Sequence, residues 1–150
     1  MTHMVTAERL AGIFERAPGL GERVARRVPS DEPDAIVATA RDELARMSER
    51  ERIAVLDAHP RIGADPAELS ERSRAEQGHA ESATVLRELA ALNDAYERKF
   101  GFRFVVFVNG RPKSALVPIL RERLARSRDE ELKSGLEEFL AISRDRLVRE

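Results

Sequence analysis

Apolar residues recur every three or four positions along most of this chain, the spacing that gathers them on one side of an α-helix. In the first half, this spacing predicts helices over about residues 6–16 and 18–28, and a third from Pro33 through Leu44. A capping-box pattern at Ser48–Glu51 then opens a fourth helix. That helix is expected to stop at His59-Pro60, because proline biases the residue before it toward an extended backbone.

In the second half, the longest helix is expected from about Ser73 to Phe100. A further helix ends near Leu124, with Pro118 in or near its first turn, and a second capping box at Ser127–Glu130 opens the last helix. The single β-like run, Arg103–Val108, is too short for a sheet and is predicted to be a buried extended segment. We therefore predict one compact all-α, multi-helix domain over residues 1–150.

Composition narrows the classes of function. The 150 residues include no Cys and three His, and the formal net charge is −1 although 35% of the residues are charged. This balance of signs gives no electrostatic footprint for nucleic acid or an anionic membrane. A chain without Cys has no disulfide, thiolate metal site or Cys nucleophile, and it suits a reducing compartment. No apolar run approaches the roughly 20 residues that span a bilayer, so a cytoplasmic protein is expected.

His59 is the one histidine in a rigid context, between the end of a helix and Pro60. An imidazole, with an unperturbed pKa of about 6.5, suits proton transfer near neutral pH. A histidine in this place can also end a helix by capping its carbonyls, so both interpretations stay open. Asp57 and His59 alone are too few ligands to indicate a metal.

Other candidate groups also have structural explanations. Ser73 and Glu76 have the spacing of a capping box, but a helix N-terminus also suits an anionic ligand, and Gln77 follows directly. The backbone of an extended segment at 104–108 lacks strand partners, and a planar heterocycle with amide-like edges would bond to it. Taken one at a time, three cations are read as solvated surface charges: Arg111, Lys113 and Arg146.

Three motifs occur in a fixed order: His59-Pro60, Ser73-x-x-Glu76-Gln77, and Leu92-Asn93-x-x-Tyr96-x-x-Lys99-Phe100-Gly101-Phe102-x-Phe104-Val105-Val106. Together they closely resemble the 2-oxo-4-hydroxy-4-carboxy-5-ureidoimidazoline (OHCU) decarboxylase family of urate breakdown. The likeness extends to Phe14-Glu15-x-Ala17-Pro18 near the start, Asn109–Lys113 in the middle and Ile142-x-x-x-Arg146-Leu147 near the end. It therefore covers nearly the whole chain.

The resemblance implies a compact all-α enzyme, usually a homodimer, that converts the small molecule OHCU to (S)-allantoin without a metal or an organic cofactor. Carried over by position, His59 is the catalytic histidine and Glu76 its acidic partner. The positions that bind substrate are then Pro60, Ser73, Gln77, Val105, Val106 and Arg146. Two positions depart from the family pattern: Arg103 stands where many members have proline, and Gly78-His79 stands where Gly-Ala is frequent.

The substrate itself suggests a mechanism. Its hydroxyl and carboxylate share a ring carbon beside a C=N bond, which can accept the electron pair as CO2 leaves, so no cofactor is required. His59 would hydrogen-bond the hydroxyl, and Glu76 with Gln77 would bind the ureido and ring nitrogens. Two other functions fit the same residues. One is a non-catalytic helical module that binds a partner, and the other is another cofactor-free lyase or hydrolase of a ureido compound.

Overall fold

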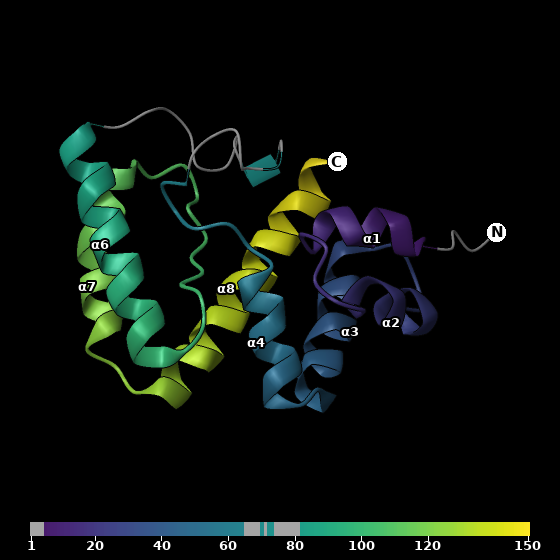
Figure 1. The fold of residues 1–150 in the computed structure, drawn as a ribbon. Helices are drawn as coiled ribbons and strands as arrows, with labels where there is room; N and C mark the ends of the chain where they lie inside the picture. Colours follow the sequence, from purple (N-terminus) through teal and green to yellow (C-terminus); the bar gives the residue numbers. More distant parts are fainter. Residues whose placement is uncertain (1–4, 65–69, 71, 74–81) are drawn as a thin grey trace.

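The computed structural model describes residues 5–64, 70, 72–73 and 82–150, and within them it contains no strand (Figure 1). Its helices are α1 (Ala7–Ile13), α2 (Leu20–Arg27), α3 (Pro33–Arg46), α4 (Glu49–Asp57), α6 (Ala83–Phe100), α7 (Lys113–Leu124) and α8 (Arg128–Arg149). The all-α prediction is therefore confirmed. Both predicted capping boxes are present, with Ser48 at the start of α4 and Ser127 at the start of α8.

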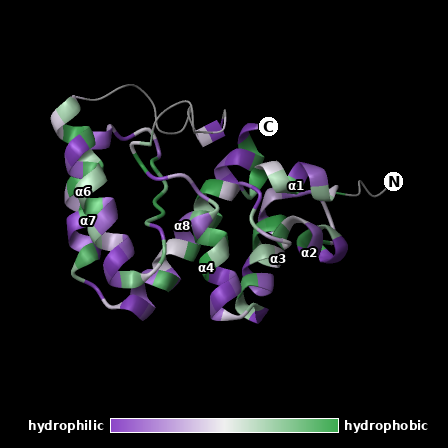
Figure 2. Cartoon of the chain, viewed as in Figure 1, coloured by the Kyte–Doolittle hydropathy of each residue, from purple (hydrophilic) through white to green (hydrophobic). Residues whose placement is uncertain are grey.

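The longest helix, α8, crosses the middle of the molecule (Figure 1). It packs against α1, α3 and α4, whereas α6 and α7 pair with each other as a hairpin on the other side. Figure 2 shows green and purple faces along the helices, as expected for amphipathic helices around a core. Apolar side chains from every one of these helices and from the extended segment form that core. None of the helices in the described ranges is long and apolar enough to cross a bilayer.

The segment from Arg103 to Val108 is extended and mostly buried, as predicted, and it runs between the α6–α7 hairpin and α8 (Figure 1). Side chains supply part of the hydrogen bonding that a neighbouring strand would give. Arg123 donates to the Val105 carbonyl at 2.8 Å, and Arg111 donates to the Val108 carbonyl at 3.0 Å. By contrast, the N–H and C=O groups of Val106 make no hydrogen bond within the described part of the chain.

Two predicted helix positions are wrong. Ser82 is extended, with ψ of 153°, and its hydroxyl accepts the N–H of Val85, so α6 begins at Ala83 and not near Ser73. The row of apolar residues at helical spacing begins only at Leu86, after this N-cap, so the expected start near Ser73 depended on its capping-box spacing alone. Pro118 lies well inside α7 and not in its first turn, because α7 already begins at Lys113.

Candidate active site

His59 follows the C-terminal end of α4, where Pro60 turns the chain away from the helix axis. Its side chain is buried, with 5% of the residue exposed, and its ring lies edge-on to Phe139 with 5.3 Å between ring centroids. Both ring nitrogens are buried and have no hydrogen-bond partner among the described residues. The Val55 carbonyl, in the last turn of α4, acts on the imidazole and favours its charged form, but it makes no well-formed hydrogen bond to it. A buried donor or acceptor left unpaired is typical of a functional group.

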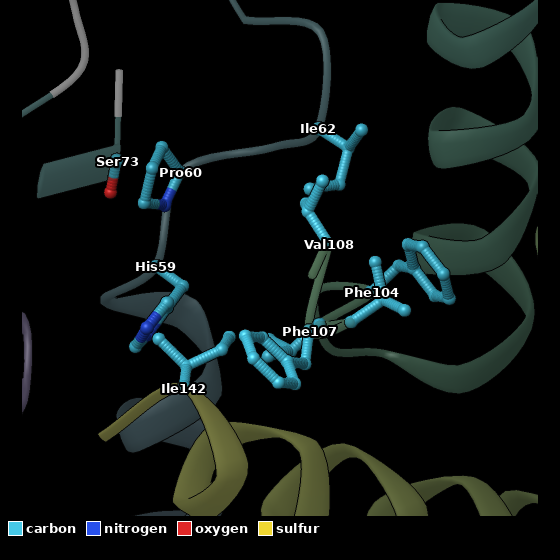
Figure 3. Close-up of a pocket in the computed structure, with 10 residues that line it drawn as sticks. His59, Pro60, Ile62, Ser73, Phe104, Phe107, Val108 and Ile142 are labelled. Carbon is cyan, nitrogen blue, oxygen red and sulfur yellow. The ribbon is translucent and has the colours of Figure 1, made fainter. Parts of the chain in front are cut away.

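The imidazole lines a small cavity at the junction of several elements (Figure 3). One wall is the chain after α4, a second is the extended segment, and Ile142 of α8 forms part of a third. The full lining is His59, Pro60, Ile62, Ser73, Phe104, Val105, Val106, Phe107, Val108 and Ile142. The free volume is about 30 Å³, room for one or two water molecules, so a ring-sized ligand requires the lining to move apart.

The environment keeps His59 neutral at neutral pH. Burial lowers the pKa of His59 to about 4, the Arg146 guanidinium acts in the same direction, and the Glu15 carboxylate opposes it. A neutral imidazole has one N–H donor and one lone pair. In this state His59 can accept a proton from a bound hydroxyl group and later return it.

Ser73 lines the same cavity and makes buried polar contacts behind it. Its hydroxyl donates to Oε1 of Glu15 at 3.1 Å and accepts from Nη2 of Arg146 at 3.3 Å. Its backbone N–H donates to the hydroxyl of Ser70 at 3.1 Å, three residues earlier, which is the geometry of an N-cap. Ser73 thus joins the cavity to the Glu15–Arg146 ion pair.

Arg146 is only 2% exposed, so its interpretation as a solvated surface charge is wrong. Its Nη1 lies 2.9 Å from Oε2 of Glu15 and 3.0 Å from the carbonyl oxygen of Ile13. Glu15 and Arg16 both have positive φ angles, 50° and 58°, a conformation that is uncommon outside glycine. This tight turn after α1 directs the Glu15 carboxylate toward α8, and packing of α8 on α1 buries the ion pair.

The structure brings five of the predicted site residues to one cavity: His59, Pro60, Ser73, Val105 and Val106. Arg146 does not line that cavity but contacts Ser73 behind it. Two predicted residues, Glu76 and Gln77, and the Gly78-His79 departure lie outside the described residues.

Glu15 was not predicted as a site residue, although it stands in the opening motif Phe14-Glu15-x-Ala17-Pro18. Much of the apolar lining, including Ile62 and Ile142, was not predicted either. Within the described ranges, no group of three or more His, Asp or Glu side chains is arranged to hold a metal ion.

Comparison with known proteins agrees with this architecture. A curated OHCU decarboxylase of Haloferax volcanii is 28% identical over 140 residues, which cover 91% of this chain and 83% of that protein. The uric acid degradation bifunctional protein of Bacillus sp. (strain TB-90) is 29% identical over 142 residues, and the match spans only 28% of its length. A crystal structure of OHCU decarboxylase in the presence of (S)-allantoin is similar with a TM-score of 0.75 and 26% identity, over 93% of this chain and 95% of that one. A family model for OHCU decarboxylase matches residues 1–148, and the chain therefore belongs to the OHCU decarboxylase family.

Proposed function

We propose that this protein is a carboxy-lyase that decarboxylates OHCU to (S)-allantoin without a metal or an organic cofactor. The observation that carries the proposal is the buried His59 imidazole, which lines the cavity with no hydrogen-bond partner for either nitrogen among the described residues. A group of this kind suits a ligand that completes its hydrogen bonds. The membership of the chain in the OHCU decarboxylase family supports decarboxylation of OHCU as the reaction at this cavity.

The protein has to transfer protons in this reaction, but it does not have to supply an electron acceptor. When the bond to the carboxylate breaks, its electron pair forms a C=C bond with the neighbouring ring carbon, and the C=N pair takes a proton on nitrogen. The hydroxyl then loses its proton to become the carbonyl of allantoin, and the neighbouring carbon gains a proton from one face. The substrate thus provides its own electron sink.

We assign the proton at the substrate hydroxyl to His59. Because the imidazole is neutral at neutral pH, it can hydrogen-bond the hydroxyl while CO2 leaves and then accept this proton as the carbonyl forms. Proton transfer by a positioned side chain typically contributes about 10²–10⁴-fold to the rate. The anionic substrate would itself favour the charged imidazolium and so help the transfer.

The remaining site residues hold the substrate ring in this proposal. The unpaired main-chain groups of Val106 would bond one amide-like edge of the ring, with the N–H of the neighbouring Val105 beside them, since the Val105 carbonyl already accepts from Arg123. Ser73 would fix the ring from the opposite wall, with Arg146 and Pro60 completing that side. By resemblance alone, Glu76 and Gln77 bind the ureido and ring nitrogens.

Two finer expectations remain: a homodimer, which the family resemblance implies, and a cytoplasmic location, which the composition of the chain suggests. We propose that the protein is a homodimer, which light scattering on the purified protein tests. We also propose a cytoplasmic location, which cell fractionation tests.

A coupled assay that starts from urate tests the activity. Urate oxidase and the hydrolase that follows it generate OHCU in place, and circular dichroism follows the optically active product. The wild-type protein is expected to produce (S)-allantoin, whereas His59→Ala is expected to lose the activity and keep its far-ultraviolet spectrum. Racemic product from well-folded wild-type protein would contradict the proposal and favour a helical module that binds a partner.

A further inference from the structure

Arg103 begins the extended wall of the cavity, and it is bonded to the end of α4 that carries His59. Its Nη1 donates to the carbonyl oxygen of His59 at 2.7 Å and to that of Asp57 at 3.1 Å. Its backbone N–H donates to Oδ1 of Asp57 at 2.9 Å. We call these three hydrogen bonds the Arg103 clamp. The clamp is reciprocal, because Arg103 and Asp57 each bond the backbone of the other through a side chain.

The clamp satisfies groups that a helix end leaves open. The last carbonyls of a helix have no partner within the helix and carry partial negative charge, so a cation is favourable there. Both side-chain bonds of Arg103 come from one atom, Nη1, at the far end of the guanidinium, and a lysine ammonium would end one bond short of it. Arg103 is therefore suited to fix both carbonyls of the turn that ends in His59.

Arg103 acts from outside the cavity. It is not among the residues that line the His59 cavity. It lines a separate surface depression of about 330 Å³, together with Glu15, Pro60 and three other residues. Its side-chain hydrogen bonds reach the cavity through the backbone of His59, and Pro60 lines both the cavity and the depression.

We propose that Arg103 is a positioning residue for the reaction: the clamp holds His59 in register with the Phe104–Val108 wall, so that imidazole and main-chain groups meet the substrate together. This inference rests on the proposed function of the cavity. A displacement of about 1 Å in a reacting group can reduce a rate about 100-fold. Loss of the clamp should therefore reduce kcat more than it changes KM.

The charge of Arg103 provides a second measurement that does not depend on the reaction rate, namely the pKa of His59. Three charged groups act on His59: Arg146 from α8, Glu15 from the turn after α1, and Arg103. Burial is the largest cause of the low pKa of His59, Arg146 and Arg103 act in the same direction, and Glu15 opposes them. Removal of the Arg103 charge therefore raises the pKa of His59, and a variant that keeps the charge leaves it low.

Two substitutions separate the hydrogen bonds from the charge. Arg103→Met removes both, and Arg103→Lys keeps the charge but places its ammonium one bond short of Nη1, the single atom that donates to both carbonyls. Arg128→Met is the matched control, since Arg128 also donates to a carbonyl at a helix end, that of Phe100. The measurements are kcat and KM for (S)-allantoin formation, the pKa of His59 by NMR titration of the ligand-free protein, and the thermal midpoint.

We expect Arg103→Met to lose about tenfold or more in kcat with KM changed less than about threefold, and to raise the pKa of His59. Arg103→Lys should lose several-fold in kcat with the wild-type pKa, and Arg128→Met should change neither quantity. Wild-type kcat in Arg103→Lys would overturn the proposal even if Arg103→Met failed to fold. If the wild-type protein formed no (S)-allantoin, the proposed function would fail. Independently of that result, an unchanged pKa of His59 in Arg103→Met would overturn the clamp.

Discussion

His59 should make the stability of the protein depend on pH. Burial and the Arg146 charge lower the pKa of His59 to about 4 in the folded chain, whereas an unfolded histidine titrates at about 6.5. Between these values the unfolded state binds more protons, so the free energy of unfolding falls as the pH drops. For this one group the loss from pH 7 to pH 5 is about 2 kcal/mol. Urea unfolding at both pH values measures it, and His59→Gln should lose correspondingly less stability than the wild type.

The Glu15 carboxylate is expected to matter for stability as well as for the site. It accepts hydrogen bonds from Arg146 and Ser73, and its side chain is 11% exposed while that of Arg146 is 2% exposed. Hydrogen bonds to charged groups contribute about 1.5–3 kcal/mol, so we expect Glu15→Ala to lower the free energy of unfolding by about that much.

A surface ion pair provides the comparison for Glu15. Asp34 pairs with Arg144, and their side chains are 81% and 54% exposed, so solvent screens the pair. Asp34→Ala should lower the free energy of unfolding by less than about 1 kcal/mol. Equal losses in the two variants, measured by urea unfolding, would show that the buried contacts of Glu15 contribute no more than the surface pair.

At single positions, the features that could be predicted from the sequence are those that depend on residues close by in the chain. His59 was located because Pro60 marks the end of a helix beside it, and the structure places its imidazole at the cavity. The pair of Glu15 and Arg146 was missed because the two residues are 131 positions apart. Neither residue carries a local signal of burial, and only the packing of α8 against α1 brings the charges together.

Two glycines in neighbouring helices should respond to alanine with opposite signs. A Cβ at Gly21 of α2 would lie 3.2 Å from the backbone N of Ala11 and 3.2 Å from the backbone O of Ala7, both in α1. Because backbone atoms cannot rotate away, Gly21→Ala should destabilise the fold by about 1–3 kcal/mol. A Cβ at Gly12 of α1 would meet nothing within 4 Å, so Gly12→Ala should stabilise it by about 0.5–1 kcal/mol. Thermal unfolding of both variants distinguishes them, and a shift of the same sign would contradict the close packing of α1 and α2.

The helix starts were predicted correctly where the cap or proline in the local sequence was unambiguous. The serine caps of α4 and α8 and the proline at the start of α3 mark helix starts that the structure confirms. The start of α6 was misplaced because Ser73 and Glu76 have the spacing of a capping box, whereas the helical row of apolar residues begins only at Leu86, after Ser82. In the structure Ser82 is the cap, since its hydroxyl accepts the N–H of Val85, whereas the hydroxyl of Ser73 donates to Glu15.

Across the whole molecule, α8 connects two groups of helices that flank the cavity. The α1, α3 and α4 helices pack directly on α8, whereas α6 pairs with α7. The hairpin is joined to α8 by a buried polar network around Glu131, which is 0% exposed. Its carboxylate accepts from the Tyr96 hydroxyl at 2.8 Å and from Nε of Arg123 at 2.6 Å. Since Arg123 also holds the Val105 carbonyl, this network supports the extended wall of the cavity.

We therefore expect Glu131→Ala to loosen the hairpin first. The substitution removes the carboxylate that faces the buried Arg123, a change that typically costs about 3–5 kcal/mol. Tyr96→Phe removes a single hydroxyl from the same network and should cost about 1 kcal/mol. In hydrogen exchange of Glu131→Ala, amides of α6 and α7 should lose more protection than those of α1 and α3, because the latter keep their direct packing around α8. Uniform loss over all helices would mean instead that the network stabilises the molecule as one cooperative unit, with no separate opening of the wall beside His59.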